Sequence, residues 1–182
     1  ADCSVFVALP ADRKGAHMSR LVALLEARVI PGAAPIGVTT LRDMLGGHPY
    51  PPALVRALAE FAAAAALLAS TLKFKGSLVV QLASEGPVRL AVVECDASLG
   101  LRATAQWRDE AGALPADATL AVLVGDLALA RLVITLDPKD GGPIYQGVVA
   151  IGGGSIAGLI EHHLAMSEQI DSRTLLVAGD VG

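Results

Sequence analysis

Apolar residues recur at two different spacings along this chain, and the change in spacing separates a helical part from a sheet-forming part. Over residues 53–72 they recur three or four positions apart, as on one side of an α-helix. The repeating residues are Leu54, Leu58, Phe61 and Ala65. Because residues 61–71 are apolar on nearly every side, we expect this helix to lie largely buried inside the protein.

After Gly76 the apolar spacing falls to two, which is typical of β-strands. The pattern predicts strands at residues 78–82, 88–92, 101–107, 127–136 and 144–151. Turn-forming residues at 85–87 and 137–142 join the first two and the last two of these strands as hairpins. Residues 108–118 are expected to form a polar loop.

The C-terminal part predicts one strand-helix-strand unit. A helix over residues 155–166 follows a cluster of glycines, and a strand over residues 173–178 follows the helix. The order of elements predicts an α+β fold, with antiparallel-rich sheets of hairpins stacked with helices. The strands are expected to form two sheets or one bent sheet.

Proline and glycine interrupt the first 47 residues, which makes this part the least regular. Helices are predicted at residues 19–28 and 40–45. Ser19 is a candidate N-cap of the first helix, and Gly46 and Gly47 end the second.

The composition favours a single folded domain spanning residues 1–182. The chain is 53% hydrophobic and 18% charged, the reverse of the balance in disordered chains. A net charge of −4 and 3% aromatic residues argue against a nucleic-acid partner. The apolar run at residues 61–71 is about half as long as a bilayer requires, and the N-terminus has no signal-peptide pattern. We therefore expect no membrane partner.

The two cysteines, Cys3 and Cys95, do not have the spacing of a metal site or of a disulfide scaffold. Their number predicts a reducing compartment, and we expect a cytoplasmic protein. Cys95 ends an apolar strand, where a buried and unreactive thiol is the more common form.

A glycine-rich turn between the last predicted hairpin and its helix carries two motifs. Gly152, Gly154 and Ala157 match a relaxed GxGxxA dinucleotide fingerprint, with Asp180 as a candidate ribose ligand. Ser155 also stands where a GxSxG nucleophile would stand. The hairpins before the turn are not βαβ units, so a structural turn is the favoured interpretation, with Ser155 as a helix N-cap.

Glu161, His162 and His163 are adjacent on the same predicted helix. Neighbours on a helix point about 100° apart, whereas metal ligands on helices are spaced three or four residues apart. We expect one histidine to face solvent and the other to be partly covered. The residues therefore predict no catalytic, cofactor-binding or metal-binding site.

Several short stretches, in their order and spacing, resemble one protein family. They are TLKF at 71–74, VQL at 80–82 with GPVRLAVV at 86–93, LVITLDP at 132–138, YQGVV at 145–149 and SEQ at 167–169. HPYPP at 48–52 opens the long helix. The chain resembles the redox-regulated holdase chaperones, the heat shock protein of thirty-three kilodaltons, over residues 48–178.

The resemblance implies an N-terminal α+β core, a helical linker, and a C-terminal zinc domain whose four cysteines act as a redox switch. The chain resembles the core alone, so we expect either a fragment from which the zinc domain is absent or a natural protein that lacks the switch, and we favour the fragment. Cys3 and Cys95 match no position of the zinc motif. We assign no cofactor to this chain, because the expected zinc belongs to the absent domain. No family role is assigned to residues 1–47.

The resemblance also implies an ATP-independent, non-enzymatic chaperone of the stress response. Such a protein binds unfolded clients through apolar surface, prevents their aggregation and forms homodimers. The client-binding residues are not identified by the resemblance. Two alternatives remain open: a nucleotide-binding enzyme that uses the turn at Gly152–Ala157, and a structural module that only docks the missing domain.

Overall fold

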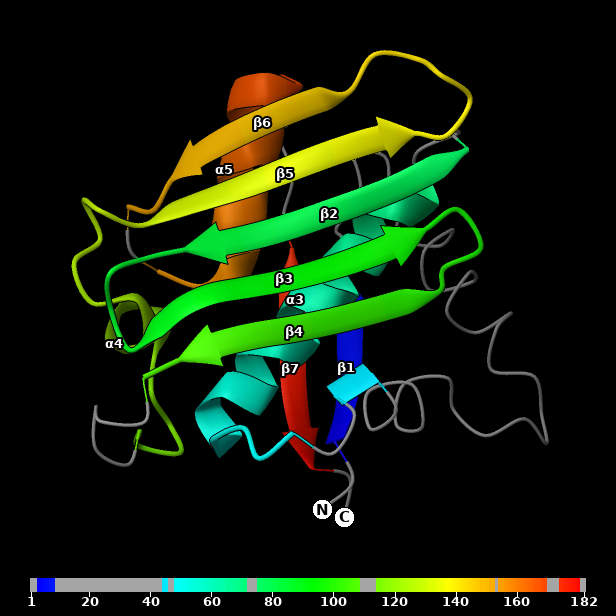
Figure 1. The fold of residues 1–182 in the computed structure, drawn as a ribbon. Coiled ribbons are helices and arrows are strands. Elements are labelled where there is room, and N and C mark those ends of the chain that lie inside the picture. The colour runs from blue at the N-terminus through cyan, green and yellow to red at the C-terminus, as the bar shows by residue number, and fades with distance from the viewer. Residues whose placement is uncertain are drawn as a thin grey trace, which may run out of the picture.

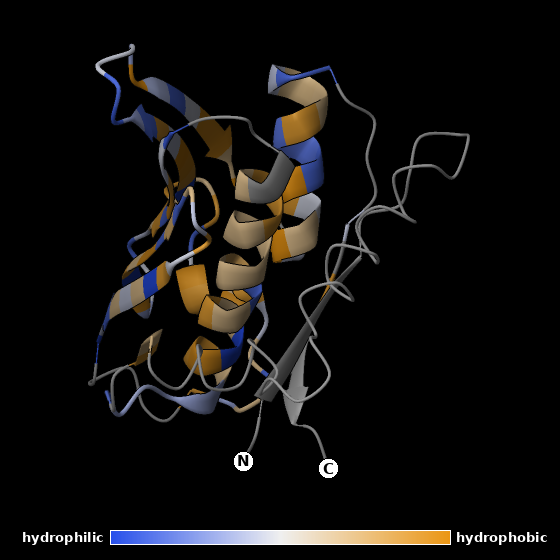
Figure 2. Cartoon of the chain, turned by 90° about the vertical axis from the view of Figure 1, so that its right-hand side faces the viewer, coloured by the Kyte–Doolittle hydropathy of each residue, from blue (hydrophilic) through white to orange (hydrophobic). Residues whose placement is uncertain are grey.

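The fold has three layers, with helices between two β-sheets (Figures 1 and 2). The computed structural model describes residues 3–8, 44–45, 48–71, 75–108, 114–152, 154–169 and 174–180. The helices are α3 (Pro52–Thr71), α4 (Leu120–Val124) and α5 (Ile156–Ser167). The strands are β1 (Cys3–Ala8), β2 (Gly76–Ala83), β3 (Val88–Asp96), β4 (Leu101–Trp107), β5 (Arg131–Pro138), β6 (Tyr145–Ala150) and β7 (Leu175–Asp180). The predicted α+β class is confirmed.

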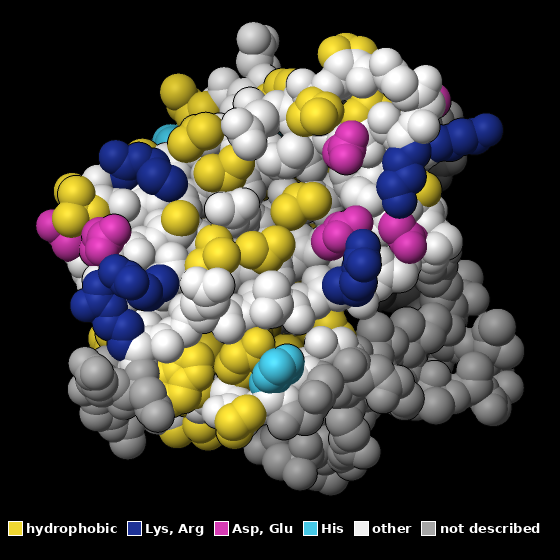
Figure 3. Space-filling model, in the orientation of Figure 1, with side chains coloured by type: hydrophobic (Ala, Val, Ile, Leu, Met, Phe, Trp, Pro, Cys, Tyr) yellow, Lys and Arg dark blue, Asp and Glu magenta, His cyan; other side chains and the backbone are white. Residues whose placement is uncertain are grey.

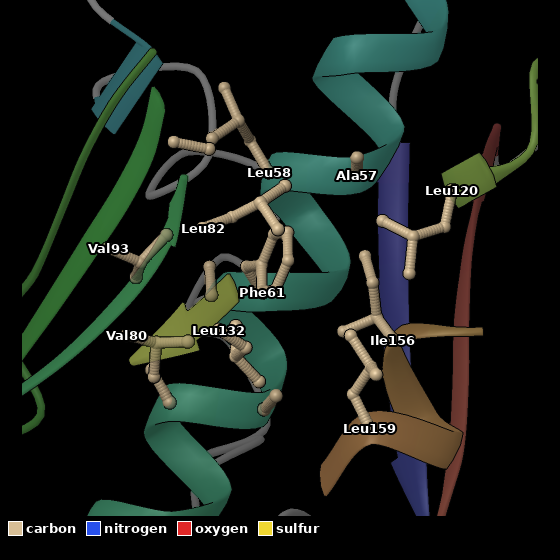
Figure 4. Packing of buried hydrophobic residues seen from close by; sticks show 14 of the residues in the cluster. Ala57, Leu58, Phe61, Val80, Leu82, Val93, Leu120, Leu132, Ile156 and Leu159 are labelled. Atoms are coloured by element: carbon tan, nitrogen blue, oxygen red, sulfur yellow. The ribbon is translucent and has the colours of Figure 1, made fainter. Parts of the chain in front are cut away.

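Helix α3 is the centre of the core, as its apolar pattern predicts. Pro52 begins it, because a proline at the first helical position gives up a backbone N–H that has no helical partner there. Leu58 and Phe61 point from α3 toward Leu82 and Val93 of the sheet (Figure 4). Both helix residues are at most 2% exposed. The alanines that follow allow close contact with the neighbouring elements.

The length and apolarity of α3 would also suit a membrane span. Residues 52–69 are long and apolar enough by composition, but 67% of that window is buried inside the protein. The helix contacts both sheets and α5. Its apolar composition is therefore accounted for by the core that it builds.

The larger sheet contains five antiparallel strands in the order β4-β3-β2-β5-β6. Both predicted hairpins are present, as β2–β3 and β5–β6. One side of this sheet packs against α3 and α5, and Figure 2 shows both helices on that side.

The predicted strand-helix-strand unit is present in the chain but does not form one sheet. Strand β7 pairs antiparallel with β1, so β6 and β7 belong to different sheets. The sequence interpretation missed β1 because it treated the whole N-terminal part as irregular. The run of β-branched and aromatic residues Val5, Phe6 and Val7 is the signal that indicates this strand.

The prediction of one strand over residues 127–136 is wrong at its start, since β5 begins at Arg131. Asp126 makes a turn instead: its carboxylate accepts a hydrogen bond from the Ala128 N–H, and its carbonyl accepts one from the Leu129 N–H. Leu127 and Leu129 are two positions apart, which is the apolar spacing of a strand, so the sequence pattern extended the predicted strand into this turn. Helix α4 was not predicted either.

The predicted helices of the N-terminal part fall mostly on residues that the structure does not describe. The helix predicted at 19–28 lies outside the described residues. Of the helix predicted at 40–45, Met44 and Leu45 are described, and both are helical.

Candidate functional site

The two faces of the five-stranded sheet have opposite roles. Side chains alternate along each strand, and the inner set faces α3 and α5. The inner residues Leu78, Val80, Leu82, Ala91, Val93, Cys95, Leu132, Ile134, Gly147 and Val149 are all buried. The core thus uses up one face of the sheet.

The outer face comprises the alternate residues, which are half-buried or exposed. It consists of Val79, Gln81, Ala83, Leu90, Val92, Glu94, Arg102, Thr104, Gln106, Arg131, Val133, Thr135, Gln146, Val148 and Ala150. The strand register places these residues in rows across the sheet. One row runs through Thr104, Val92, Gln81, Val133 and Val148.

Apolar side chains extend across the middle of the outer face, and no described helix covers them. Figure 3 shows hydrophobic side chains gathered over the centre of this surface, with charged groups toward its two sides. Seven of the outer-face residues are Val, Leu or Ala: Val79, Ala83, Leu90, Val92, Val133, Val148 and Ala150. Val148 and Ala150 are exposed and the other five are half-buried, and an apolar sheet face that keeps this much contact with solvent is a candidate interaction site.

Ion pairs lie at both ends of the strands rather than at the centre of the outer face. At one end, Arg102 and Glu94 are 2.8 Å apart. At the other, Glu85 lies 3.6 Å from Arg89 and 3.8 Å from Arg108. Such exposed pairs contribute little to stability. Because these charges lie at the ends of the strands, the middle of the outer face is uncharged.

The β3–β4 turn fixes another charged group at the edge of this surface. The Asp96 carboxylate accepts hydrogen bonds from the Ser98 hydroxyl, the Ser98 N–H and the Gly100 N–H. These bonds, led by that of the Ser98 hydroxyl, lower the pKa of Asp96. The carboxylate therefore stays ionised at the border of the apolar region.

Behind the sheet, α5 is fixed to β6 by a buried histidine. His163 is 5% exposed, and a Cβ added to Gly147 would lie 2.7 Å from its Cε1 atom. Its Nδ1 atom is 3.3 Å from the Ser167 hydroxyl. Burial lowers the pKa of His163, although the Glu168 carboxylate acts in the opposite direction. The helix thus packs on Gly147, the one position of β6 that has no side chain.

The glycine-rich turn forms between β6 and α5 as predicted, but not as a nucleotide site. Gly154 adopts a φ of 93°, and the Ser155 hydroxyl accepts a hydrogen bond from the Gly158 N–H, as an N-cap does. A dinucleotide fingerprint requires parallel strands on both sides of the helix. Because β7, which contains Asp180, pairs with β1, that requirement is not met.

A hollow of about 550 Å³ lies beside this turn. Its lining includes Leu127, Arg131, Ile151, Leu159 and His162. Neither a carboxylate nor a hydroxyl lines it, so among the described residues it offers no pair for acid–base or nucleophilic catalysis.

The remaining sequence candidates do not come together either. His162 is exposed and His163 is buried, so the expected difference between the two histidines is confirmed. Glu161 accepts a hydrogen bond from the Thr174 N–H. No cluster of metal-ligating residues occurs within the described ranges.

Cys95 is fully buried, as predicted, with its Sγ atom 3.7 Å from the Asp96 carbonyl oxygen. Only the backbone of Cys3 is described, where it pairs with Asp180 across the small sheet. The outer face was not identified by sequence reasoning, because apolar strand residues look alike whether they face a core or a partner.

Known proteins are similar to this chain in sequence or in fold. A 33 kDa chaperonin of Methylobacillus flagellatus is 45% identical over 138 residues, which are 75% of this chain and 45% of that protein. One from Aeromonas salmonicida is 39% identical over 140 residues, covering 77% of this chain and 45% of its own length. The chain therefore spans about half the length of the curated relatives it matches.

A solved structure has the same fold. The 33 kDa chaperonin of Thermotoga maritima superposes with a TM-score of 0.57 at 18% identity, over 77% of this chain and 50% of that one. The family described as Hsp33 protein matches residues 21–181. This chain is a member of the Hsp33 family.

Proposed function

We propose that this chain is a holdase chaperone that binds unfolded proteins on the outer face and prevents their aggregation without ATP. The observation that carries the proposal is the band of apolar side chains, bordered by ion pairs, across the sheet face that no described helix covers. Its relatives are named 33 kDa chaperonin, which supports the same function.

The chemistry of this surface suits clients of many sequences. Apolar contact is non-directional and roughly proportional to the area removed from water, so it does not depend on a particular client side chain. Thr104, Gln81 and Thr135 interrupt the apolar band with uncharged polar groups, which cost less to cover than charged groups would. Clients that expose different apolar segments on unfolding can therefore bind to the same surface.

We propose further that this chain acts independently of oxidants. It has two cysteines, and the thiol of Cys95 is fully buried in the core. Since a thiol reacts as an exposed thiolate, peroxide is expected to leave Cys95 unmodified in the folded chain. Peroxide with a zinc chelator should leave the holdase activity of this chain unchanged. A strong oxidant response would contradict this part of the proposal.

The proposal is tested by light scattering of thermally unfolding malate dehydrogenase, in reducing buffer without ATP. Val92, Val133 and Val148 lie in one row of the outer face, and all three are changed to Thr. Threonine keeps the branched shape that a strand favours but replaces a methyl group with a hydroxyl. A buried methyl is worth about 0.8 kcal/mol, so three changes remove about 2 kcal/mol of client affinity, more than tenfold.

Val122→Thr is the matched control, because Val122 is 45% exposed on α4, away from the outer face. We expect the wild type and this control to suppress scattering alike, and the triple variant to suppress it far less. Unchanged scattering with the wild type would favour a module that only docks another domain. Equal suppression by the triple variant would place client binding elsewhere.

A further inference from the structure

The two edges of the five-stranded sheet differ in how they are closed. Along β4, the Ala105 N–H donates a hydrogen bond of 3.1 Å to the Tyr50 hydroxyl. Tyr50 belongs to the segment that leads into α3, and this segment lies along the β4 edge (Figure 1). Arg102 and Arg108 add charge there. Blocked and charged edges do not accept another strand.

The β6 edge has none of these protections within the described part of the chain. Its sequence, Tyr145–Ala150, contains no charged residue, no proline and no bulge. No described strand pairs with its free side. An uncharged edge strand presents unpaired backbone N–H and C=O groups to any extended chain.

Exposed apolar side chains gather at this same edge. Of the six large hydrophobic residues that are exposed in the described part, four lie on or beside β6: Ile144, Tyr145, Val148 and Met166. Met166 is 71% exposed and belongs to the last turn of α5. That turn is held near β6 by the Tyr145 hydroxyl, which lies 3.4 Å from Glu168 Oε1.

The last turn of α5, which ends at Ser167 and is called the ledge below, extends beyond the β6 edge of the sheet. The helix crosses behind β5 and β6, and its C-terminal end reaches past β6 in Figure 1. His163 contacts Gly147 of β6, and Met166 follows His163 by three residues, on the same helical stripe. The three residues from His163 to Met166 rise about 4.5 Å along the helix, close to the roughly 4.8 Å that separates neighbouring strands. A strand added beside β6 would therefore rest on the last turn of α5 and cover Met166.

We propose that the β6 edge receives an extended apolar segment of an unfolded client by strand addition. This inference rests on the proposed holdase function and names the way in which the client is held. Backbone hydrogen bonds give affinity without regard to client sequence, and Ile144, Val148 and Met166 add apolar contact on both sides of the added strand. The added strand also extends the apolar outer face.

The ledge argues for a client strand rather than a second copy of this chain. The helix crosses β6 at Gly147, in the middle of the strand. Antiparallel pairing of two β6 strands centred on Gly147 would place a twofold axis at the same point. Both α5 ends would then lie over that axis on the same side of the sheet, although packed helices need about 8–10 Å between their axes. A single client strand brings no helix and meets no such conflict.

The test compares two short peptides of alternating valine and threonine with lysines at both ends. One has ordinary amides, and the other carries an N-methyl group on every valine and threonine, which removes the backbone donors from both edges of the peptide strand but not its apolar surface. NMR of the labelled chain measures affinity and amide exchange in β6. We expect the ordinary peptide to slow exchange of β6 amides and to bind at least tenfold more tightly. Equal binding of both peptides would overturn strand addition.

Met166→Ser is expected to weaken binding of the ordinary peptide several-fold, whereas Leu129→Ser, at a residue 57% exposed in the turn before β5, should not. Sedimentation velocity without peptide is expected to show no β6-dependent dimer; a dimer that protects β6 amides would contradict the proposal. The scattering assay separates the two claims. Suppressed aggregation with equal binding of both peptides rejects strand addition alone. Slowed β6 exchange without suppressed aggregation rejects the holdase function alone. If neither slowed exchange nor suppressed aggregation is observed, both claims are rejected.

Discussion

Adding one methyl group at Gly147 should weaken the attachment of α5 to the sheet. The new Cβ of Gly147→Ala would lie 2.7 Å from Cε1 and 3.3 Å from Nδ1 of His163. The imidazole has little room to retreat, because it is 5% exposed and contacts the Ser167 hydroxyl through Nδ1. Overpacking of this kind costs about 1–3 kcal/mol. For a domain of this size, that lowers Tm by roughly 2–4 °C for each kcal/mol.

Urea unfolding followed by circular dichroism measures this loss. Gly152→Ala is the control, because a Cβ at Gly152 meets no atom within 4 Å. It should leave stability unchanged or raise it by up to about 1 kcal/mol. Adding His163→Ala to Gly147→Ala should recover part of the loss, since the two side chains then no longer collide. Gly147→Ala with wild-type stability would refute the contact between His163 and β6.

Two further predictions concern single groups. Burial holds the pKa of His163 in the folded chain below its ordinary value of 6.5. As pH falls, the imidazole of the unfolded chain is therefore protonated before that of the folded chain. The free energy of unfolding consequently falls as pH drops from about 6.5 toward the folded pKa. Urea unfolding between neutral pH and about pH 5 should show a weaker pH dependence in His163→Gln than in the exposed control His162→Gln; equal slopes would argue against a buried neutral imidazole. Tyr50→Phe should cost about 1 kcal/mol, because it leaves the Ala105 N–H without its acceptor. Tyr145→Phe, which loses an exposed 3.4 Å contact, should cost less in the same urea titration, and the reverse order would contradict the capping of the β4 edge.

The sequence predicted the elements whose local signals agree with their surroundings. Helix α3 and the two hairpins carry unbroken periods of 3.6 and 2, and Ser155 caps α5 as expected. The start of β5 was misplaced because Leu127 and Leu129 continue a strand-like alternation into a turn that Asp126 determines. In that segment a local hydrogen bond overrode the apolar pattern.

Which strands pair, and which face is left open, could not be predicted from periodicity. The pairing of β7 with β1 joins residues from opposite ends of the chain, and no local signal encodes it. That pairing removes the basis for a nucleotide site at Gly152 and Gly154. The outer face follows from α3 and α5 both packing on one side of the sheet. Its valines, such as Val92 and Val133, read the same as the buried Val80 and Val93.

These two sets of valines provide the most direct test of the account. In methyl NMR spectra of the chain, Val79, Val92, Val133 and Val148 report on the outer face, and Val80, Val93 and Val149 report on the core. On adding a permanently unfolded client protein in reducing buffer, we predict shifts or broadening of the outer-face methyls and unchanged signals from the core methyls. Unchanged outer-face methyls in the presence of bound client would contradict the central claim that this face holds unfolded proteins.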